Sequence, residues 1–429
     1  MVYNNSGGNN MILNLRFQNA YVFSNEVSLS LEANMQTKKF HSNVYSENNF
    51  NVVKSIGLYG QNNVGKTKFI QCIKIIKSVM LNEKFNILPN WFNNDNISKF
   101  GISFLVNGRK YDFEFKINTK NRNIMYESFS EILKDEYGNE KIKCLLKRDL
   151  KNSIFECLDS ELKNILPFTA NNNILIYLLD TSKFENLKFI KETIIKFAKK
   201  IDVIDMNNPP ISNTISILKS HNKLQDKVVE FIKNADLYLE DYKYDENIQL
   251  IKAPQQKERN DLLKEEINLI PVAAIDQLKI VSVYKGKPVP SLIFDSIGTK
   301  KIAAIAGFVI DALENNKILI IDEMDSSLHF KLTRSIVSMF NNELNKNSQL
   351  IFTVHDINLL DLKKLFRKEQ IAFMEKYDDS VRIFRLSDFT AADGIRDTTD
   401  IIEKYKKGIL GAIPHPNLYK SLWSIFDGK

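Results

Sequence analysis

A glycine-bounded loop between an expected strand and an expected helix constrains this chain more than any other feature of its sequence. The loop, residues 60–67, reads GQNNVGKT and completes the pattern of a P-loop, G-x-x-x-x-G-K-[ST]. Its glycines permit backbone angles that side chains forbid, so the loop can turn its N–H groups around a polyphosphate. The lysine brings a cation to the phosphates, and the threonine hydroxyl can ligate Mg²⁺. The pattern therefore predicts nucleotide contacts from Gly60, Gln61, Asn62, Asn63, Val64, Gly65, Lys66 and Thr67, with Thr67 also a metal ligand.

The residues on both sides of the loop favour a nucleotide site over the alternative, a turn followed by an ordinary amphipathic helix. Those before it form the apolar run of a buried parallel strand, and those after it recur every three positions, as on one helix face. They are Val52, Val53, Ile56 and Leu58 before the loop, and Ile70, Ile73, Ile76 and Val79 after it. A helix from about residue 66 to 80 would direct the positive end of its dipole at the phosphates.

Composition narrows the class of protein. The chain has 429 residues, 44% of them hydrophobic, so it can bury a large core, and two or three domains are expected. It has no run of about 18 apolar residues that would predict a transmembrane helix, and its polar first ten residues do not resemble a signal peptide. Three cysteines without metal-site spacing argue against a disulfide framework. We therefore expect a cytoplasmic protein that does not contact membranes.

The charge of the chain leaves contact with nucleic acid open. Its formal net charge is +7, from 59 basic and 52 acidic residues. Such an excess is compatible with nucleic-acid binding, but mixed charges without a compact basic cluster are more typical of a solvated surface.

An apolar strand that ends in acids supplies the chemistry expected for hydrolysis. Residues 317–322 read KILIID, and Glu323 follows. Asp322 is expected to hold Mg²⁺, whereas Glu323 would point to the other face of the strand and polarise the attacking water as a general base. The alternative, a strand that merely ends in acids at the surface, is weak beside a P-loop.

A histidine ends the next expected strand, in residues 350–355, LIFTVH. A lone histidine at a strand end usually makes a local hydrogen bond. His355 would lie one strand beyond Asp322, however, at the carboxyl ends of parallel strands, where ligands bind. There it can hydrogen-bond to a γ-phosphate, so the predicted catalytic residues are Glu323, His355 and Lys66.

A serine and a glycine open a further expected helix, in residues 295–301, DSIGTKK. They form a second anion-binding feature at a helix N-terminus. An ordinary N-capped helix would explain the serine but not the spacing from Asp322. One protomer does not need two such features for one triphosphate, so we expect Ser296 and Gly298 of one copy to close over the nucleotide of another. This predicts a homo-oligomer with composite ATP sites, as in ABC-type ATPases.

The order of expected elements predicts an α/β fold: an ABC-type P-loop ATPase domain with a mixed sheet and an antiparallel layer. Alternating runs at 12–17 and 27–31, and a hairpin at 101–117, supply the antiparallel layer. A third strand near 125–133 is expected to join the hairpin. Strands and helices alternate over 317–354, which indicates a parallel sheet.

The nucleotide domain is interrupted, because the P-loop and the acidic strand are far apart in the sequence. We expect an N-terminal part at 11–120, which carries the P-loop, and a C-terminal part at 276–429. Between them, residues 121–275 are expected to form a mainly helical insertion, with helices near 185–199 and 224–235.

Four motifs together resemble the ABC-type, AAA-like ATPase family related to RloA. They are residues 60–67, residues 295–301, LIIDEMDSSLH at 319–329 and LIFTVHDINLLD at 350–361. Relatives of this family include the ATPase domain of OLD-family proteins and the PARIS and AbiL anti-phage ATPases. The opening strands and the segment at 405–414 resemble the family as well, and the insertion resembles it least.

The resemblance implies a role for each predicted site residue in Mg²⁺-dependent ATP hydrolysis. It makes Lys66 and Thr67 the Walker A pair, Asp322 and Glu323 the Walker B pair, Ser296 and Gly298 the signature, and His355 the switch histidine. Residues 325–329 correspond to the D-loop, which crosses the dimer interface. Two departures stand out: Tyr21 occupies a place where the family often has arginine, and the signature reads Ser-Ile-Gly-Thr.

The resemblance also implies a biological role. ATPases of this kind act as sensors or scaffolds in bacterial anti-phage defence by abortive infection, and they control a second protein from the same operon, such as a nuclease or toxin.

Two alternatives stay open: a component of an OLD-like nuclease, and a DNA-binding repair ATPase like SMC or RecF proteins. No convincing acidic set follows His355, and no long coiled coil or strong basic face is evident. Residues 118–121, NTKN, lack the aspartate of the guanine-reading motif, which disfavours a GTPase.

Overall fold

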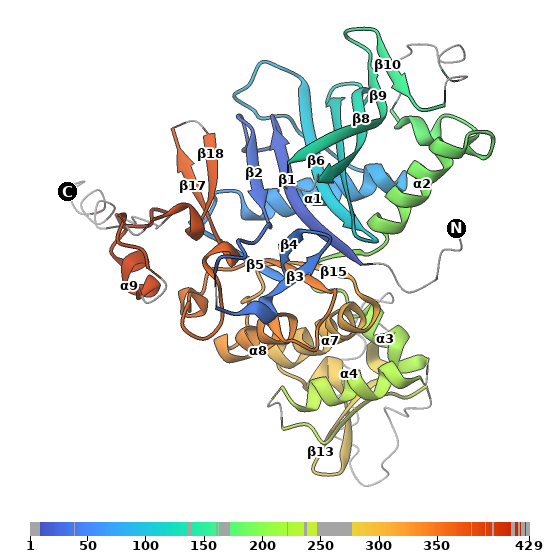
Figure 1. Ribbon diagram of the computed structural model, residues 1–429. Helices are drawn as coiled ribbons and strands as arrows, with labels where there is room; N and C mark the ends of the chain where they lie inside the picture. The colour runs from blue at the N-terminus through green and yellow to red at the C-terminus, as the bar shows by residue number, and fades with distance from the viewer. Residues whose placement is uncertain are drawn as a thin grey trace.

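The structure is a computed structural model that describes residues 9–37, 39–134, 139–159, 162, 172–220, 222–235, 238–246, 277–378, 380–390, 392–396, 399–412, 417–418, 421 and 425. The last part of the predicted insertion, residues 247–275, lies outside the described residues. A six-stranded, mostly parallel sheet and a seven-stranded antiparallel sheet dominate the fold (Figure 1). This confirms the predicted α/β class with an antiparallel layer.

The parallel sheet has the strand order β11-β15-β16-β5-β17-β18. Its strands are β11 (Ile201–Asp205), β15 (Ile318–Asp322), β16 (Gln349–Thr353), β5 (Ser55–Gly60), β17 (Ile371–Tyr377) and the antiparallel β18 (Ser380–Arg385). Every residue of β5, β15 and β16 is buried. Continuous apolar runs form such strands because helices or a second sheet cover both faces of a parallel sheet.

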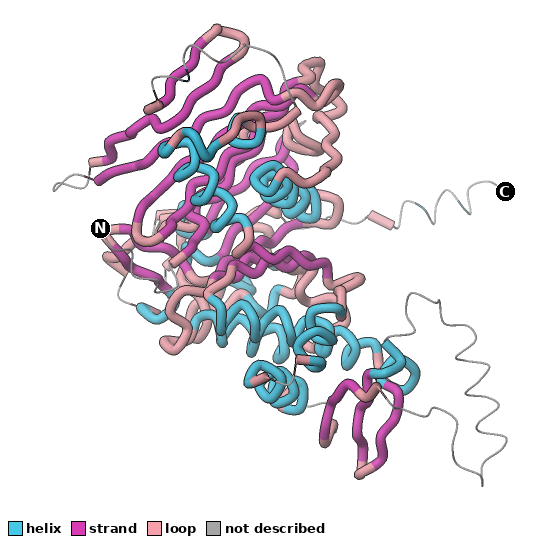
Figure 2. The backbone as a smooth tube through the Cα atoms, turned by 90° about the vertical axis from the view of Figure 1, so that its right-hand side faces the viewer, coloured by secondary structure: helices cyan, strands magenta, loops and turns pink. Residues whose placement is uncertain are grey.

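Alternate residues of these strands belong to two hydrophobic cores. On one face, Ile56, Ile320 and Ile351 pack with helix α1 (Lys66–Leu81) and the antiparallel sheet. On the other face, Leu319 and Phe352 pack with α7 (Ile297–Asn315) and α8 (Phe330–Asn341). Figure 2 shows the resulting layers, with most of the strands above and most of the helices below.

The antiparallel sheet has the order β10-β9-β8-β7-β6-β1-β2. Its strands are β1 (Asn10–Gln18), β2 (Val27–Ser30), β6 (Ile97–Val106), β7 (Arg109–Asn118), β8 (Ile124–Lys134), β9 (Glu140–Asp149) and β10 (Ile154–Cys157). The predicted hairpin is confirmed, because β6 and β7 pair from Val106–Arg109 outward around Asn107-Gly108. A separate pair, β3 (Val44–Glu47) and β4 (Phe50–Val53), lies between β2 and β5 in the chain.

The predicted mainly helical insertion at 121–275 needs correction in its described part. Strands β8 to β10 extend the antiparallel sheet, and β11 joins the parallel sheet beside β15. Helix α2 (Glu185–Ala198) packs on α1, and its Phe197 stacks on Phe104 of β6 at 4.0 Å between ring centroids. The helices predicted near 185–199 and 224–235 are present, as α2 and α4 (Lys223–Lys233).

A buried ion pair joins strands β8 and β9 and also binds the segment that follows β10. Glu127 of β8 and Arg148 of β9 lie 2.6 Å apart with side chains 2% and 4% exposed, and Glu127 also accepts the N–H of Leu175 at 3.0 Å. The strand predicted near 125–133 is confirmed as β8, which pairs with β7 of the hairpin. The sequence conceals β9, because this strand begins with four exposed residues, EKIK, without an alternating pattern, and because sheet partners outweigh local propensity.

A smaller unit with its own core contains α3 (Ser212–Lys219), α4, β12 (Asp241–Tyr244), β13 (Ile280–Tyr284), β14 (Lys287–Pro290) and α6 (Ser291–Phe294). It packs on α7, where Gly307 allows close approach: a Cβ there would lie 2.8 Å from the backbone nitrogen of Thr214. The Thr214 hydroxyl donates to the Ala303 carbonyl at 2.8 Å and accepts the Gly307 N–H at 3.0 Å. Helix α7 therefore belongs to both units.

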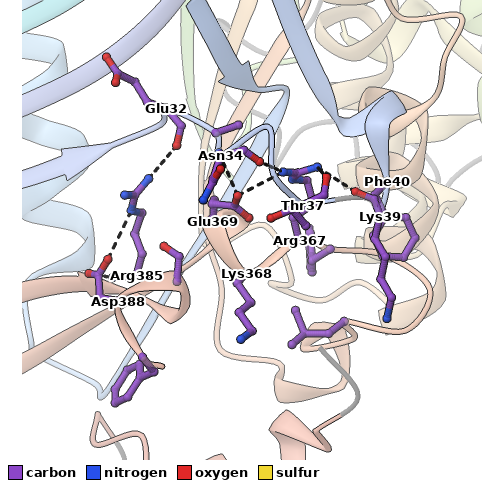
Figure 3. A pocket seen from close by; sticks show the side chains of 15 residues that line it. Glu32, Asn34, Thr37, Lys39, Phe40, Arg367, Lys368, Glu369, Arg385 and Asp388 are labelled. Atoms are coloured by element: carbon purple, nitrogen blue, oxygen red, sulfur yellow. Dashed lines mark hydrogen bonds and ion pairs between the residues drawn. The ribbon is translucent and has the colours of Figure 1, made fainter. Parts of the chain in front are cut away.

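A polar joint connects the segment after β2 with the start of β17 (Figure 3). The guanidinium of the buried Arg367 donates to the carbonyls of Asn34 at 2.6 Å and Lys39 at 2.8 Å, and pairs with Glu369 at 3.2 Å. Arg385 bonds to the Glu32 carbonyl at 2.9 Å. A cavity of about 450 Å³ lies within this joint, at the opposite end of β17 from the P-loop.

The last helix with described bounds is α9 (Ile401–Lys406). Among the described residues, no helix is both long and apolar enough to cross a bilayer.

Candidate nucleotide-binding site

The predicted P-loop connects β5 to α1, with Gly60 as the last strand residue and Thr67 in the first helical turn. Each of its two glycines lies so close to a neighbouring residue that a side chain would not fit. A Cβ on Gly60 would lie 2.5 Å from the Met374 carbonyl oxygen of β17, and one on Gly65 would overlap the side chain of Val22. Gly65 also has a φ of 112°, in the left-handed region that favours glycine. The loop conformation thus depends on β17 and on the turn after β1.

Lys66 is held inside the loop. Its side chain is buried, and Nζ donates to the carbonyl oxygens of Gly60 at 2.7 Å and Gln61 at 3.0 Å. Burial lowers the pKa of Lys66 to about 8, while the negative charges of Glu323, Asp325 and Asp322 oppose that shift. A poorly solvated ammonium group gains more from an anion than a solvated one does. The arrangement therefore suits a phosphate.

Asp322 ends β15 and lies within reach of the P-loop. Its Oδ1 accepts the Thr353 hydroxyl at 2.6 Å, and the Thr67 hydroxyl lies close enough to lower its pKa. Burial raises the pKa of Asp322, and these two hydroxyl donors oppose the rise. A carboxylate beside a threonine hydroxyl offers the hard oxygen ligands that Mg²⁺ prefers, together with waters and phosphate oxygens. The two residues predicted as metal ligands therefore lie together and fit the ion.

Glu323 follows with a φ of 52°, and its carboxylate bonds to the loop after β11, whereas that of Asp322 bonds to β16. Its N–H donates to Thr353 Oγ1 at 2.7 Å, and its Oε2 accepts the side-chain amide of Asn207 at 2.8 Å. Thr353 therefore fixes both acids: its hydroxyl donates to Asp322 and accepts from Glu323. The sequence prediction that the two acids face different ways agrees with this geometry.

His355 lies two residues beyond β16, beside the D-loop segment. The backbone N–H groups of His355 and Asp356 both donate to Asp325 Oδ2, at 3.0 and 2.7 Å. Burial and the charge of Lys66 lower the pKa of His355, against the nearby carboxylates, so its imidazole is neutral at pH 7. A neutral imidazole can donate one hydrogen bond from an exposed position at the edge of the site.

Ser296 and Gly298 lie at the N-terminus of α7. Ser296 caps the helix, because its hydroxyl accepts the Thr299 N–H at 3.1 Å. A Cβ on Gly298 would be 3.3 Å from the Ser327 carbonyl oxygen. Within the described residues, no hydrogen bond joins Ser296 or Gly298 to residues 60–67. The structure thus gathers Lys66, Thr67, Asp322, Glu323 and His355 in one copy and leaves the signature pair apart from them.

Two residues of the site were not predicted: Thr353, which bridges the two acids, and Asn207, which binds Glu323. Asp325 was expected only as the first residue of the D-loop, and here it holds the segment of His355. Thr353 lies two positions before His355 in a strand that the sequence predicts, so its position at the site could have been predicted. Asn207 follows β11, which the sequence did not reveal as a strand of this sheet.

Polyphosphate affinity should fall as the pH rises through about 8. The pKa of Lys66 is lowered in the free protein, so above that pH the side chain must take up a proton to bind an anion. Affinity would weaken by up to about tenfold per pH unit. Titration calorimetry with ATP from pH 7 to 9.5 tests this, in buffers of different ionisation enthalpy. Lys66→Arg is the control, because any binding it retains should not change over this range. A flat wild-type profile would contradict the prediction.

Thr353→Val should lower Mg²⁺-dependent ATP hydrolysis at least about tenfold and destabilise the fold by about 1–3 kcal/mol, because both acids lose their shared hydroxyl. The matched control is Thr333→Val on α8, where a buried hydroxyl has no hydrogen-bond partner among the described residues. That change should leave hydrolysis unaltered and cost no stability. Thermal unfolding and steady-state hydrolysis measure both effects, and equal behaviour of the two variants would remove Thr353 from the site.

Comparisons with known proteins give one family match, which covers less than half of the chain. Residues 165–361 match the family model described as "AAA domain, putative AbiEii toxin, Type IV TA system", a range that contains the signature, both acids and His355 but not the P-loop. No curated protein matches the chain.

Two SMC heads are among the solved structures that the chain is similar to. The first is the SMC head domain from Thermotoga maritima, with 11% identity and a TM-score of 0.40 over 87% of this chain and 98% of that one. The second is an SmcHead bound to the C-winged helix domain of ScpA, with 11% identity and a TM-score of 0.45 over 90% and 99%. Residues 165–361 are thus similar to an AAA domain, and the P-loop and the acidic strand lie at one end of a parallel sheet, as in the P-loop ATPase fold.

Proposed function

We propose that this protein binds Mg²⁺-ATP and hydrolyses it in a homo-oligomer whose assembly depends on the nucleotide. One observation supports this above the others: Lys66, Thr67, Asp322 and Glu323 meet at the carboxyl ends of neighbouring strands β5, β16 and β15. Ligands of open parallel sheets bind at that edge.

Each residue has a role that its surroundings support. Residues 60–67 wrap the phosphates, and Lys66 exchanges its bonds with the loop carbonyls for bonds with phosphate oxygens. Thr67 and Asp322 hold Mg²⁺, which supplies positive charge to the phosphate oxygens. Glu323 accepts a proton from the attacking water, and the neutral His355 donates a hydrogen bond toward the γ-phosphate.

The exposed apolar residues around the signature support assembly. Phe294 and Ile297 flank Ser296 and are 53% and 67% exposed. Large apolar side chains in such a position lose contact with water when another copy covers them. We propose that Ser296 and Gly298 of one copy then complete the ATP site on the P-loop of the other.

Glu323→Gln should bind ATP but hydrolyse it at least about 100-fold more slowly, since it lacks the general base. It should therefore accumulate as an oligomer when ATP is present, as measured by light scattering. Adding Ser296→Arg to the same variant should leave ATP binding intact and abolish the oligomer, because the large cation blocks closure. Lys66→Ala should bind no ATP. An oligomer that survives Ser296→Arg would argue against composite sites.

We further propose that the protein is a sensor or scaffold in bacterial anti-phage defence by abortive infection, and that it controls a partner such as a nuclease or toxin. Two findings support this: the motif resemblance to anti-phage ATPases, and a family model whose description names a toxin–antitoxin system. The nucleotide state would bias an assembly that restrains or releases the partner.

Co-expression with the neighbouring gene tests this role. We expect a stable complex with a second protein, and phage protection that Lys66→Ala abolishes. Native mass spectrometry with ATP gives the stoichiometry. A homo-oligomer without a partner, whose ATP hydrolysis DNA stimulates, would instead favour an SMC- or RecF-like DNA-binding ATPase.

A further inference from the structure

The carboxylate of Glu323 is bound by a residue from a distant part of the chain. Asn207 lies just after β11, and its Nδ2 donates to Glu323 Oε2 at 2.8 Å. Among the described residues, no other side chain forms a hydrogen bond with that carboxylate. The backbone of Glu323 is fixed separately, because its N–H bonds to Thr353 Oγ1. The direction of the side chain therefore depends on Asn207.

Asn207 is itself held in place from two sides. Its N–H donates to Asp205 Oδ1 at 2.9 Å, and the preceding residue, Met206, donates its N–H to the carbonyl of Asp322 at 3.0 Å. The loop after β11 is thus anchored to the end of β15. The side-chain oxygen of Asn207 accepts the hydroxyl of Ser326 at 3.1 Å, which turns the amide nitrogen toward Glu323.

The same chain of hydrogen bonds reaches the signature helix. Lys301 of α7, buried to 8% exposure, donates from Nζ to Ser326 Oγ at 2.9 Å and to Ser327 Oγ at 3.3 Å. Gly298, one turn earlier on α7, lies against the carbonyl of Ser327. A shift of α7 would therefore move Ser326, and with it the amide of Asn207.

We propose that Asn207 is a positioning residue for Glu323, and that Lys301 and Ser326 couple its orientation to the N-terminus of α7. This rests on the proposed general-base role of Glu323. The amide N–H occupies Oε2 and fixes the direction of the carboxylate, while Oε1 stays available to a water. In the proposed oligomer, Ser296 and Gly298 bind the nucleotide on the P-loop of the other copy. The chain of hydrogen bonds therefore links closure of that ATP site to Glu323, the general base of the copy's own ATP site.

The test compares Asn207→Asp with Asn208→Asp in the full-length protein with Mg²⁺-ATP. Both variants make the same nearly isosteric change, but only the first places an acceptor against Glu323 Oε2. Asn207→Asp should lower kcat at least about tenfold, the worth of one charge-assisted hydrogen bond, with ATP affinity unchanged within about twofold. Asn208→Asp should match wild type in both kcat and ATP affinity. A wild-type kcat for Asn207→Asp would overturn the proposal.

A double-mutant comparison separates positioning from general damage. In a Glu323→Gln background, Asn207→Asp should lower kcat no further, because the group it positions is already lost. A further tenfold loss there would refute positioning. If Asn207→Asp melts below the assay temperature, Ser326→Ala serves instead and should lower kcat about threefold. Wild-type kcat in both Ser326→Ala and Lys301→Met would overturn the coupling to α7.

Failure of this inference differs from failure of the proposed function. If wild type binds no ATP, or if Glu323→Gln hydrolyses it at the wild-type rate, the proposed function fails. If Glu323→Gln is inactive while Asn207→Asp retains full activity, only the positioning role of Asn207 fails.

Discussion

The parallel register of β15, β16 and β5 determines where the P-loop, the two acids and Thr353 lie relative to one another. Ile321 pairs with Phe352, and Thr353 pairs with Leu58, so the three strands end at one level. Asp322, Thr353 and the first P-loop residue, Gly60, consequently share one edge of the sheet. A shift of β16 by one residue would turn Thr353 to the opposite face and separate the two acids from their common hydroxyl.

Electrostatics at this edge favour the arrival of an anion and a divalent cation together. Burial lowers the pKa of Lys66 and raises the pKa of Asp322, so each charge is costly while it lacks a fully matched partner. A phosphate would relieve the first cost and a divalent cation the second. The left-handed backbone at Glu323, with a φ of 52°, is a further cost at the same point, and strain of this kind tends to collect at functional sites.

Helix α7 connects the site to the rest of the molecule. One of its faces packs on the parallel sheet through Ile302 and Ile305, and another packs on the smaller unit through Ala303 and Ala306. Its N-terminus presents Ser296 and the exposed Ile297. A helix shared between two cores in this way transmits displacement as a rigid body, which is the property that the proposed coupling through Lys301 requires.

The α/β class, the P-loop and the acidic strand follow from local chemistry, so the sequence predicts them. Glycines occur where the backbone needs a positive φ or a close contact, and continuous apolar runs form buried strands. The hairpin at Asn107-Gly108 and the strand after it, β8, were predictable for the same reason. The sequence did not predict that β9 and β10 extend the antiparallel sheet or that β11 lies beside β15. The residues of β9 carry a weak pattern, and β11 pairs with a strand that is distant in sequence. Asn207 could not be predicted for the same physical reason: its hydrogen bond to Glu323 spans 116 residues and exists only once β11 has joined the sheet.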